Sequence, residues 1–250
     1  MALPYTLTPD DRQKIGLIVL QSDETIEADM RRLFPVDVDL LISRVPSGTA
    51  VTSDSLQQMA EVLTDAASLF PQGAKFSVIG YGCTSGTAQI GARKIAALIR
   101  AGAMAQDVTE PVTALVATCK ALGVSRIGLI SPYVAEVSEG LRTVLSQNGI
   151  TVTAFASFDE PQEKNVVRIA SASITDAATE LCREQEFDAL FLSCTNLRTL
   201  DLIDSLEVTT GLPILSSNQV LAWHMMKQAG DILPSFAPGR LWKSGNQTAR

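Results

Sequence analysis

Two cysteines have nearly the same neighbours in the two halves of this 250-residue chain. Cys83 is followed by Thr84 and Cys194 by Thr195, and each pair comes directly after an apolar run typical of a β-strand. A cysteine thiolate can attack carbon or take a proton from it, and a second cysteine in the thiol form can return a proton. The sequence therefore predicts a pair of catalytic thiols that needs no cofactor.

The residues around both cysteines are small and polar. Ser85 extends the first pair and Asn196 the second, so both places offer hydrogen-bond donors and a closely approachable backbone. Ligands of parallel sheets bind outside the carboxyl ends of the strands. Backbone N–H groups at a helix N-terminus also lower the pKa of a cysteine. We therefore expect both thiols to face one small molecule across a cleft.

A purely structural role is the alternative for every cysteine, because a buried cysteine usually behaves as a small apolar side chain. Cys119 and Cys182 fit that role, since each lies inside an amphipathic helical pattern. The matched positions of Cys83 and Cys194 favour catalysis.

Short strand-like runs alternate with helical patterns along the chain, which is typical of parallel sheets wrapped by helices. The expected strands cover residues 15–20, 38–43, 76–81, 126–131, 151–157, 188–193 and 213–216. The expected helices cover residues 25–33, 52–70, 87–100, 112–122, 135–147, 173–185 and 219–228. The polar runs 107–110 and 159–164 are predicted to be solvated loops.

The chain also repeats itself once. Residues 15–18 (IGLI) recur as residues 127–130, and the two cysteines keep nearly the same offset. This pattern predicts an α/β fold of two similar parallel-sheet domains related by a pseudo-twofold axis, with the active site in the cleft between them. We expect residues 1–110 plus 215–250 to form the half with Cys83, and residues 111–214 to form the half with Cys194.

Composition excludes several classes of function. A net charge of −7 argues against nucleic-acid binding, which requires clustered Lys and Arg. The single histidine, His224, is expected on the surface or packed in a helix, and no zinc-type spacing of Cys and His occurs. The first residues lack the layout of a signal peptide, and no apolar run reaches the roughly 18 residues of a membrane span. We expect a cytoplasmic protein with reduced cysteines, no metal and no membrane partner.

Four short motifs resemble one known superfamily. The chain from about residue 14 to residue 227 is similar to the aspartate/glutamate racemase superfamily, most of all to its branch of maleate cis-trans isomerases, arylmalonate decarboxylases and ectoine-utilisation proteins. The motifs are residues 15–19 (IGLIV), 82–86 (GCTSG), 131–133 (SPY) and 193–196 (SCTN).

The resemblance implies cofactor-independent chemistry on a small carboxylate. In maleate isomerases one cysteine attacks the double bond to give a covalent succinyl-type adduct, and a second cysteine handles the proton. By this match Cys83 would be the nucleophile and Cys194 the acid/base partner. Tyr133 and Asn165 would bind the substrate carboxylate, together with backbone amides after each cysteine.

One position departs from the maleate isomerases. They carry a substrate-binding asparagine after the first strand, whereas this chain has Asp23. A carboxylate there costs roughly 1–4 kcal/mol beside a dicarboxylate, and it would instead attract an ammonium group or a hydrogen-bond donor. In this respect the chain resembles the ectoine-utilisation branch.

Several functions remain open at this point. Maleate-type cis-trans isomerisation is the concrete expectation, with racemisation or epimerisation of an amino-acid or ectoine-derived compound as the main alternative. An arylmalonate-type decarboxylase is less favoured, because that branch resembles a one-cysteine version of the site. A non-catalytic binding protein would not need two matched thiols. The family's frequent dimers imply a homo-oligomer, either a dimer or a dimer of dimers.

Overall fold

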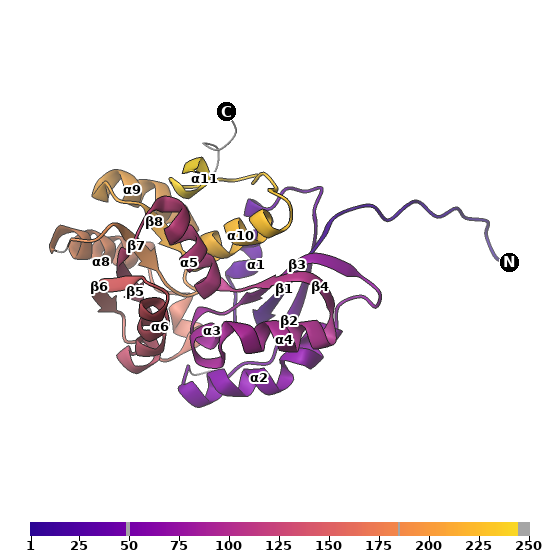
Figure 1. Cartoon of the computed structure of the whole chain (residues 1–250), viewed down its shortest axis with the longest axis horizontal. Helices are drawn as coiled ribbons and strands as arrows, with labels where there is room; N and C mark the ends of the chain where they lie inside the picture. Colours follow the sequence, from indigo (N-terminus) through magenta and orange to yellow (C-terminus); the bar gives the residue numbers. More distant parts are fainter. Residues whose placement is uncertain (49–50, 185, 245–250) are drawn as a thin grey trace.

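The computed structural model describes residues 1–48, 51–184 and 186–244. Two four-stranded parallel sheets lie side by side with helices packed around them, which confirms the predicted α/β class (Figure 1). The first sheet contains β1 (Lys14–Leu20), β2 (Asp39–Val45), β3 (Lys75–Gly82) and β4 (Met104–Thr109). The second sheet contains β5 (Arg126–Ser131), β6 (Thr151–Ser157), β7 (Ala189–Leu192) and β8 (Ile214–Ser216).

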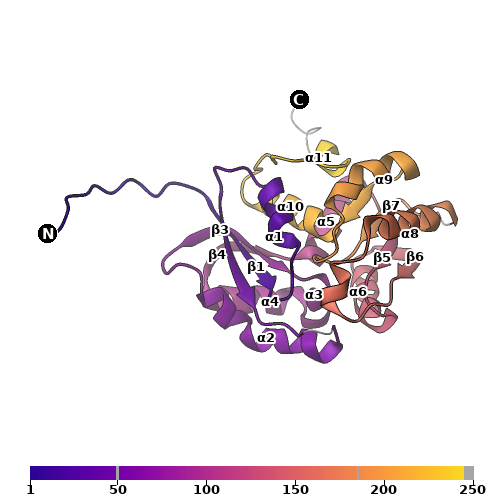
Figure 2. The same cartoon turned by 180° about the vertical axis from the view of Figure 1, so that it is seen from behind.

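The helices lie in the connections between strands and after the last strand (Figure 2). They are α1 (Ile26–Leu33), α2 (Ser53–Ser68), α3 (Thr84–Ile90), α4 (Ala92–Gly102), α5 (Pro111–Leu122), α6 (Ala135–Gln147), α7 (Glu163–Val166), α8 (Ser171–Glu184), η1 (Leu200–Leu202, a 3-10 turn), α9 (Ile203–Thr210), α10 (Ser217–Gln228) and α11 (Leu241–Ser244).

Both sheets have the same strand order. The first runs β2-β1-β3-β4 and the second runs β6-β5-β7-β8, so each sheet has its first strand paired with its second and third. The repeated IGLI segments therefore fall on β1 and β5, two strands with a strand on either side. Their apolar residues are fully buried, as expected for the centre of a parallel sheet. The two cysteines then follow the equivalent strands β3 and β7.

Three local predictions were wrong. The helix expected at 87–100 is two helices, because Gly91 breaks it with a φ of 91°. Residues 107–109 are not a solvated loop but the end of β4, where pairing with β3 overrides a polar sequence. Glu110 is buried, since its carboxylate caps α5 by accepting hydrogen bonds from the amides of Val112 and Thr113. The run 159–164 contains the start of α7 and the buried Glu163.

Other differences concern the ends of elements. The helix expected at 173–185 begins earlier, at Ser171, and residue 185 lies outside the described residues. The expected division between residues 214 and 215 falls within β8, so the last residues of that strand belong to the second sheet. The domain division itself stays a prediction, and residues 245–250 lie outside the described part.

Helix α10 leaves the second sheet and packs back on the first. It contacts α1, β3 and α5. Gly80 on β3 permits this approach, because a Cβ there would lie only 2.6 Å from Sδ of Met225. The N-terminus of α10 is thereby fixed beside the ends of both β3 and β7.

Candidate active site

A small pocket lies at the carboxyl ends of strands from both sheets. Both sheets contribute to it, and both predicted catalytic thiols line it. The lining residues are Leu20, Asp23, Cys83, Thr84, Ser85, Tyr133, Glu163, Cys194, Thr195 and Asn196.

Cys83 occupies the position directly before α3. Its side chain is 5% exposed, and Sγ accepts a hydrogen bond from the Gly86 amide at 3.1 Å. Burial raises the pKa of the Cys83 thiol to about 12, which the Gly86 amide opposes and the nearby Glu163 and Asp23 carboxyl groups reinforce. Burial therefore favours the neutral thiol form of Cys83.

Cys194 has a strained backbone. Its φ is 101°, a conformation that residues with a side chain rarely adopt and that recurs at functional sites. The Cys194 amide donates to Oγ of Ser217 at 3.0 Å, while Sγ accepts from the Asn196 amide at 3.3 Å. Burial raises the pKa of this thiol well above its ordinary value, and Glu163 raises it further, whereas the hydrogen bond with Tyr133 lowers it.

Ser217, the first residue of α10, connects the two cysteine loops. Its Oγ lies 2.8 Å from Oγ1 of Thr84 and also accepts the Cys194 amide. Thr195 adds a second link, because its hydroxyl donates to the carbonyl oxygen of Gly82 at 3.2 Å. The ends of β3 and β7 are therefore held together by side chains next to both thiols.

Tyr133 stands between Cys194 and Glu163. Its hydroxyl lies 2.9 Å from Cys194 Sγ and donates to Oε1 of Glu163 at 2.6 Å. Asn196 donates from Nδ2 to Oε2 of the same carboxyl group at 3.0 Å. Burial raises the pKa of Glu163, although both hydrogen bonds lower it. The result is a buried polar network that ends at one of the two thiols.

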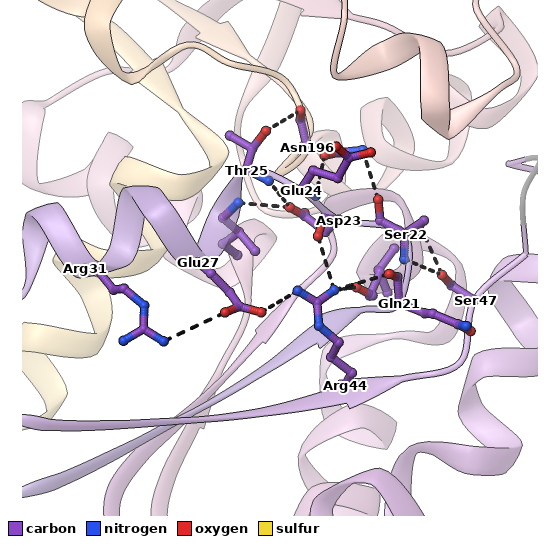
Figure 3. A network of polar contacts seen from close by, with 12 residues as sticks. Gln21, Ser22, Asp23, Glu24, Thr25, Glu27, Arg31, Arg44, Ser47 and Asn196 are labelled. Carbon is purple, nitrogen blue, oxygen red and sulfur yellow. Dashed lines mark hydrogen bonds and ion pairs between the residues drawn. The ribbon is translucent and has the colours of Figure 1, made fainter.

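Asp23 forms the turn after β1, and Figure 3 shows its surroundings. Its Oδ1 accepts the amides of Thr25 at 2.8 Å and Ile26 at 2.9 Å. Its Oδ2 is buried and has no hydrogen-bond partner among the described residues. Burial raises the pKa of Asp23, while these amides, the nearby Thr195 hydroxyl and the charge of Arg44 lower it.

The structure brings together eight of the nine predicted site residues. Asn165 is the exception, because it does not line the pocket and its Nδ2 donates to Oε2 of Glu160 at 3.1 Å. Glu163, two positions earlier, lies in the pocket instead, and the sequence analysis missed it. The only available signal was the resemblance, which placed a carboxylate-binding side chain in this segment but at a neighbouring position.

The other candidate residues lie outside the pocket. Cys119 is buried in α5 and Cys182 is half-buried in α8. His224 packs in α10 with Nδ1 2.7 Å from Oγ1 of Thr109. Within the described residues, no group of three or more His, Cys, Asp or Glu could hold a metal ion. No helix in that same part of the chain is long and apolar enough to cross a membrane.

This arrangement suits proton transfer and covalent chemistry at carbon. Two thiols whose pKa values are raised by burial share one small pocket, and each accepts a backbone amide that would stabilise a thiolate once it forms. The amides of Thr84 and Ser85 open α3, where the first N–H groups of a helix have no intrahelical acceptor.

Comparisons with known proteins find relatives along most of the chain. The family model described as arylmalonate decarboxylase matches residues 15–242. The arylmalonate decarboxylase of Bordetella bronchiseptica is 30% identical over 220 residues, which cover 86% of this chain and 90% of that protein. The maleate isomerase of Nocardia farcinica is 25% identical over 245 residues, which cover 91% of this chain and 93% of that protein.

Solved structures match the fold. A liganded double variant of arylmalonate decarboxylase superposes with a TM-score of 0.80 at 29% identity, covering 92% of this chain and 98% of that one. A maleate isomerase variant from Pseudomonas putida, crystallised with maleate, has a TM-score of 0.81 at 21% identity, covering 93% and 98%. The branch named by the sequence motifs is therefore confirmed, and the chain belongs to the arylmalonate decarboxylase family of enzymes.

Proposed function

We propose that this protein is a two-cysteine isomerase that acts on a small carboxylate without a cofactor. One observation supports this proposal above all others: Cys83 and Cys194 follow equivalent strands of the two sheets and line the same pocket. A pair of thiols can add and remove a proton, or a covalent bond, at two positions of one substrate.

The first candidate reaction is maleate-type cis-trans isomerisation. Cys83 first releases its proton to solvent. Its thiolate then adds to one alkene carbon, and the displaced electron pair takes a proton from the Cys194 thiol at the other carbon, which leaves Cys194 as a thiolate. Rotation about the resulting single bond follows, Cys194 takes the proton back, and expulsion of Cys83 re-forms the alkene. Four curated maleate isomerases are relatives of this chain. A structure of the Nocardia farcinica enzyme contains a covalent succinylcysteine intermediate.

The second candidate reaction is racemisation or epimerisation next to a carboxylate. One cysteine removes the proton from the carbon, and the other returns a proton on the opposite face. The unpartnered Oδ2 of Asp23 favours this reaction, because a buried carboxyl group without a donor suits an amino-bearing substrate better than maleate.

Decarboxylation of an arylmalonate is the third reaction that the relatives raise. It requires a proton donor on one face only, so it leaves the second thiol of this pocket without a role. The presence of both thiols favours isomerisation over this reaction.

The substrate carboxylate has a suitable place among polar groups next to the thiols. The hydroxyl groups of Thr84, Ser85 and Thr195, the Asn196 side chain and the first amides of α3 surround this end of the pocket. In this proposal Tyr133 contacts substrate as well as Cys194, and Asn165 has no direct contact.

One experiment separates these reactions. Purified, reduced protein is incubated in deuterated water separately with maleate, D-aspartate, L-aspartate and phenylmalonate. Each mixture is followed by proton NMR, and the two aspartate mixtures are also analysed by chiral chromatography to detect inversion. Fumarate, exchange of an α-proton with inversion, or phenylacetate identifies the reaction. Isomerisation or inversion supports the proposal, whereas phenylacetate alone would overturn it, as would no conversion of any compound by protein shown to be folded.

A further inference from the structure

The Asp23 side chain lines the pocket and has one carboxyl oxygen without a hydrogen-bond partner among the described residues. Oδ1 is fully used in the turn, since it accepts both the Thr25 and Ile26 amides. Oδ2 accepts no hydrogen bond from the described residues, although the side chain is only 3% exposed. The nearby Thr195 hydroxyl donates to Gly82 instead. A buried carboxyl oxygen without a donor is costly, so a ligand that supplies a donor would be bound favourably.

Glu163 is a second buried carboxyl group in the same pocket. It is 4% exposed and is held in place by Tyr133 on one oxygen and by Asn196 on the other. Asn196 also accepts the Glu24 amide at Oδ1, at 2.9 Å, which ties Glu163 to the turn that carries Asp23. The two acidic side chains are therefore held by one connected network. Asp23 keeps one oxygen without a partner, and the two bonded oxygens of Glu163 keep further lone pairs for a donor on the substrate.

No positive side chain balances these two acids inside the pocket. The lining residues that the structure describes include no Lys, Arg or His. Arg44 is the nearby cation, but it donates to the backbone carbonyls of Leu20 and Asp23 and pairs with Glu27 (Figure 3). Its guanidinium group is thereby engaged by the backbone of the turn and by Glu27. A positively charged group on the ligand would therefore meet both carboxyl groups with no competing cation among the lining residues.

We propose that Asp23 and Glu163 form an ammonium subsite, so that the substrate is a carboxylate that also carries a positively charged amino group. This inference rests on the proposed function, because it assigns a substrate class to the same pocket. Aliphatic amino carboxylates fit such a pocket, whereas simple dicarboxylates such as maleate place a second negative charge where the protein already has two acids.

The subsite also gives the amino group a part in activating the thiols. The charges of Glu163 and Asp23 raise the pKa of Cys83 and of Cys194. A bound ammonium offsets both charges, and thiolate formation becomes easier only when such a substrate is present. The pocket would thereby keep its thiols protonated and unreactive until the correct substrate enters.

Two thiol reagents of nearly equal size test the charge preference without any turnover. Aminoethyl methanethiosulfonate delivers an ammonium group, and sulfonatoethyl methanethiosulfonate delivers a negative charge. The rate of modification of each cysteine is measured by mass spectrometry, and each reagent is normalised to its rate with 2-mercaptoethanol. Cys182, which is half-buried outside the pocket, reports the effect of the overall charge of −7 on the same molecules.

We expect the ammonium reagent to be favoured more than tenfold at Cys83 and Cys194, after correction for Cys182. Asp23→Asn replaces only the unpartnered Oδ2 and keeps the acceptor Oδ1. This variant should reduce the preference several-fold, and combination with Glu163→Gln should abolish it. Glu160→Gln removes an equal charge from the same segment but outside the pocket, and it should leave the preference unchanged.

Equal reaction of both reagents with the wild-type pocket would overturn the inference. So would a preference that survives in the double variant, or a pocket that admits neither reagent. The outcome is independent of catalysis. Conversion of maleate by a pocket without charge preference would keep the proposed isomerase and reject the ammonium subsite. A charge preference without conversion of any carboxylate would keep the ammonium subsite and reject the proposed isomerase.

Discussion

The hydroxyl of Tyr133 lies 2.9 Å from Sγ of Cys194 and 2.6 Å from a carboxyl oxygen of Glu163. When Cys194 ionises, the hydroxyl proton can turn from Glu163 to the thiolate, so this contact lowers the pKa of a thiol that burial and Glu163 raise. Tyr133→Phe should therefore raise the pKa of Cys194 and slow its alkylation by iodoacetamide several-fold at pH 8. Mass spectrometry after timed alkylation gives the rate at each cysteine. Because Tyr133 does not hydrogen-bond Cys83, a similar slowing at both cysteines would contradict this role.

Gly86 has little room for a side chain behind Cys83. A Cβ at this position would lie 2.8 Å from Cys83 Sγ and 2.8 Å from the Tyr81 hydroxyl. Gly86→Ala should displace the thiol, lower the rate of the isomerisation at least tenfold and cost about 1–3 kcal/mol of stability through overpacking. Urea denaturation and the NMR assay check both effects.

Gly140 provides the matched control for this substitution. It lies in helix α6, and a Cβ there would meet no atom within 4 Å. Gly140→Ala should stabilise the protein by about 0.5–1 kcal/mol and leave the rate unchanged, because alanine favours the helix. Equal effects of the two substitutions would show that the crowding around Cys83 is not important.

The backbone conformation of Cys194 should make a glycine variant at this position more stable than an alanine variant, which is the reverse of the usual order. With φ at 101°, any residue with a side chain is strained there, whereas glycine is not. Cys194→Gly should therefore be more stable than Cys194→Ala by about 1 kcal/mol, despite the greater freedom of glycine in the unfolded chain. Thermal and urea denaturation of both variants measure this difference. A more stable alanine variant would show that the strain is absent.

The raised pKa of Asp29 should make the stability of the protein depend on pH. Burial raises the pKa of this residue from 3.8 to about 6, against the hydrogen bond that Asn218 donates to it at 2.8 Å. Between these two values the folded protein holds a proton that the unfolded chain does not, so Asp29 makes stability fall as the pH rises through that window. Asp29→Asn removes this contribution. Relative to wild type, the variant should gain about 1–3 kcal/mol between pH 4.5 and pH 7.5.

Urea denaturation of both proteins at the two pH values provides the test. The comparison uses the change with pH rather than the absolute stability, since the substitution also alters packing around Asn218. A difference between variant and wild type that stays constant with pH would contradict the raised pKa.

The sequence predicts the architecture well where a strand is buried on both faces. The apolar runs that became β1 and β5 are short and almost free of polar residues, and their repetition predicted two similar sheets. Strand β4 was missed because it is an edge strand with a polar sequence, and only its pairing with β3 makes it a strand. Local periodicity carries no information about such a partner.

The candidate site was predictable to the extent that its residues adjoin a cysteine or a recognised motif. Thr84, Ser85, Thr195 and Asn196 were found in this way. Glu163 was not, because it lies in a polar run that looks like a solvated loop. Its burial depends on Tyr133 and Asn196, which are distant in sequence and meet it only in the folded chain. Of the two buried acidic residues in the pocket, the sequence therefore predicted only Asp23.

The proposed function requires two thiols that act on one substrate. This requirement is tested by the NMR assay on whichever carboxylate the wild-type protein isomerises, repeated with Cys83→Ala and with Cys194→Ala, using Cys119→Ala as a control outside the pocket. We expect both pocket variants to lose at least a hundredfold in rate and the control to retain the wild-type rate. A wild-type rate in either pocket variant would contradict this requirement.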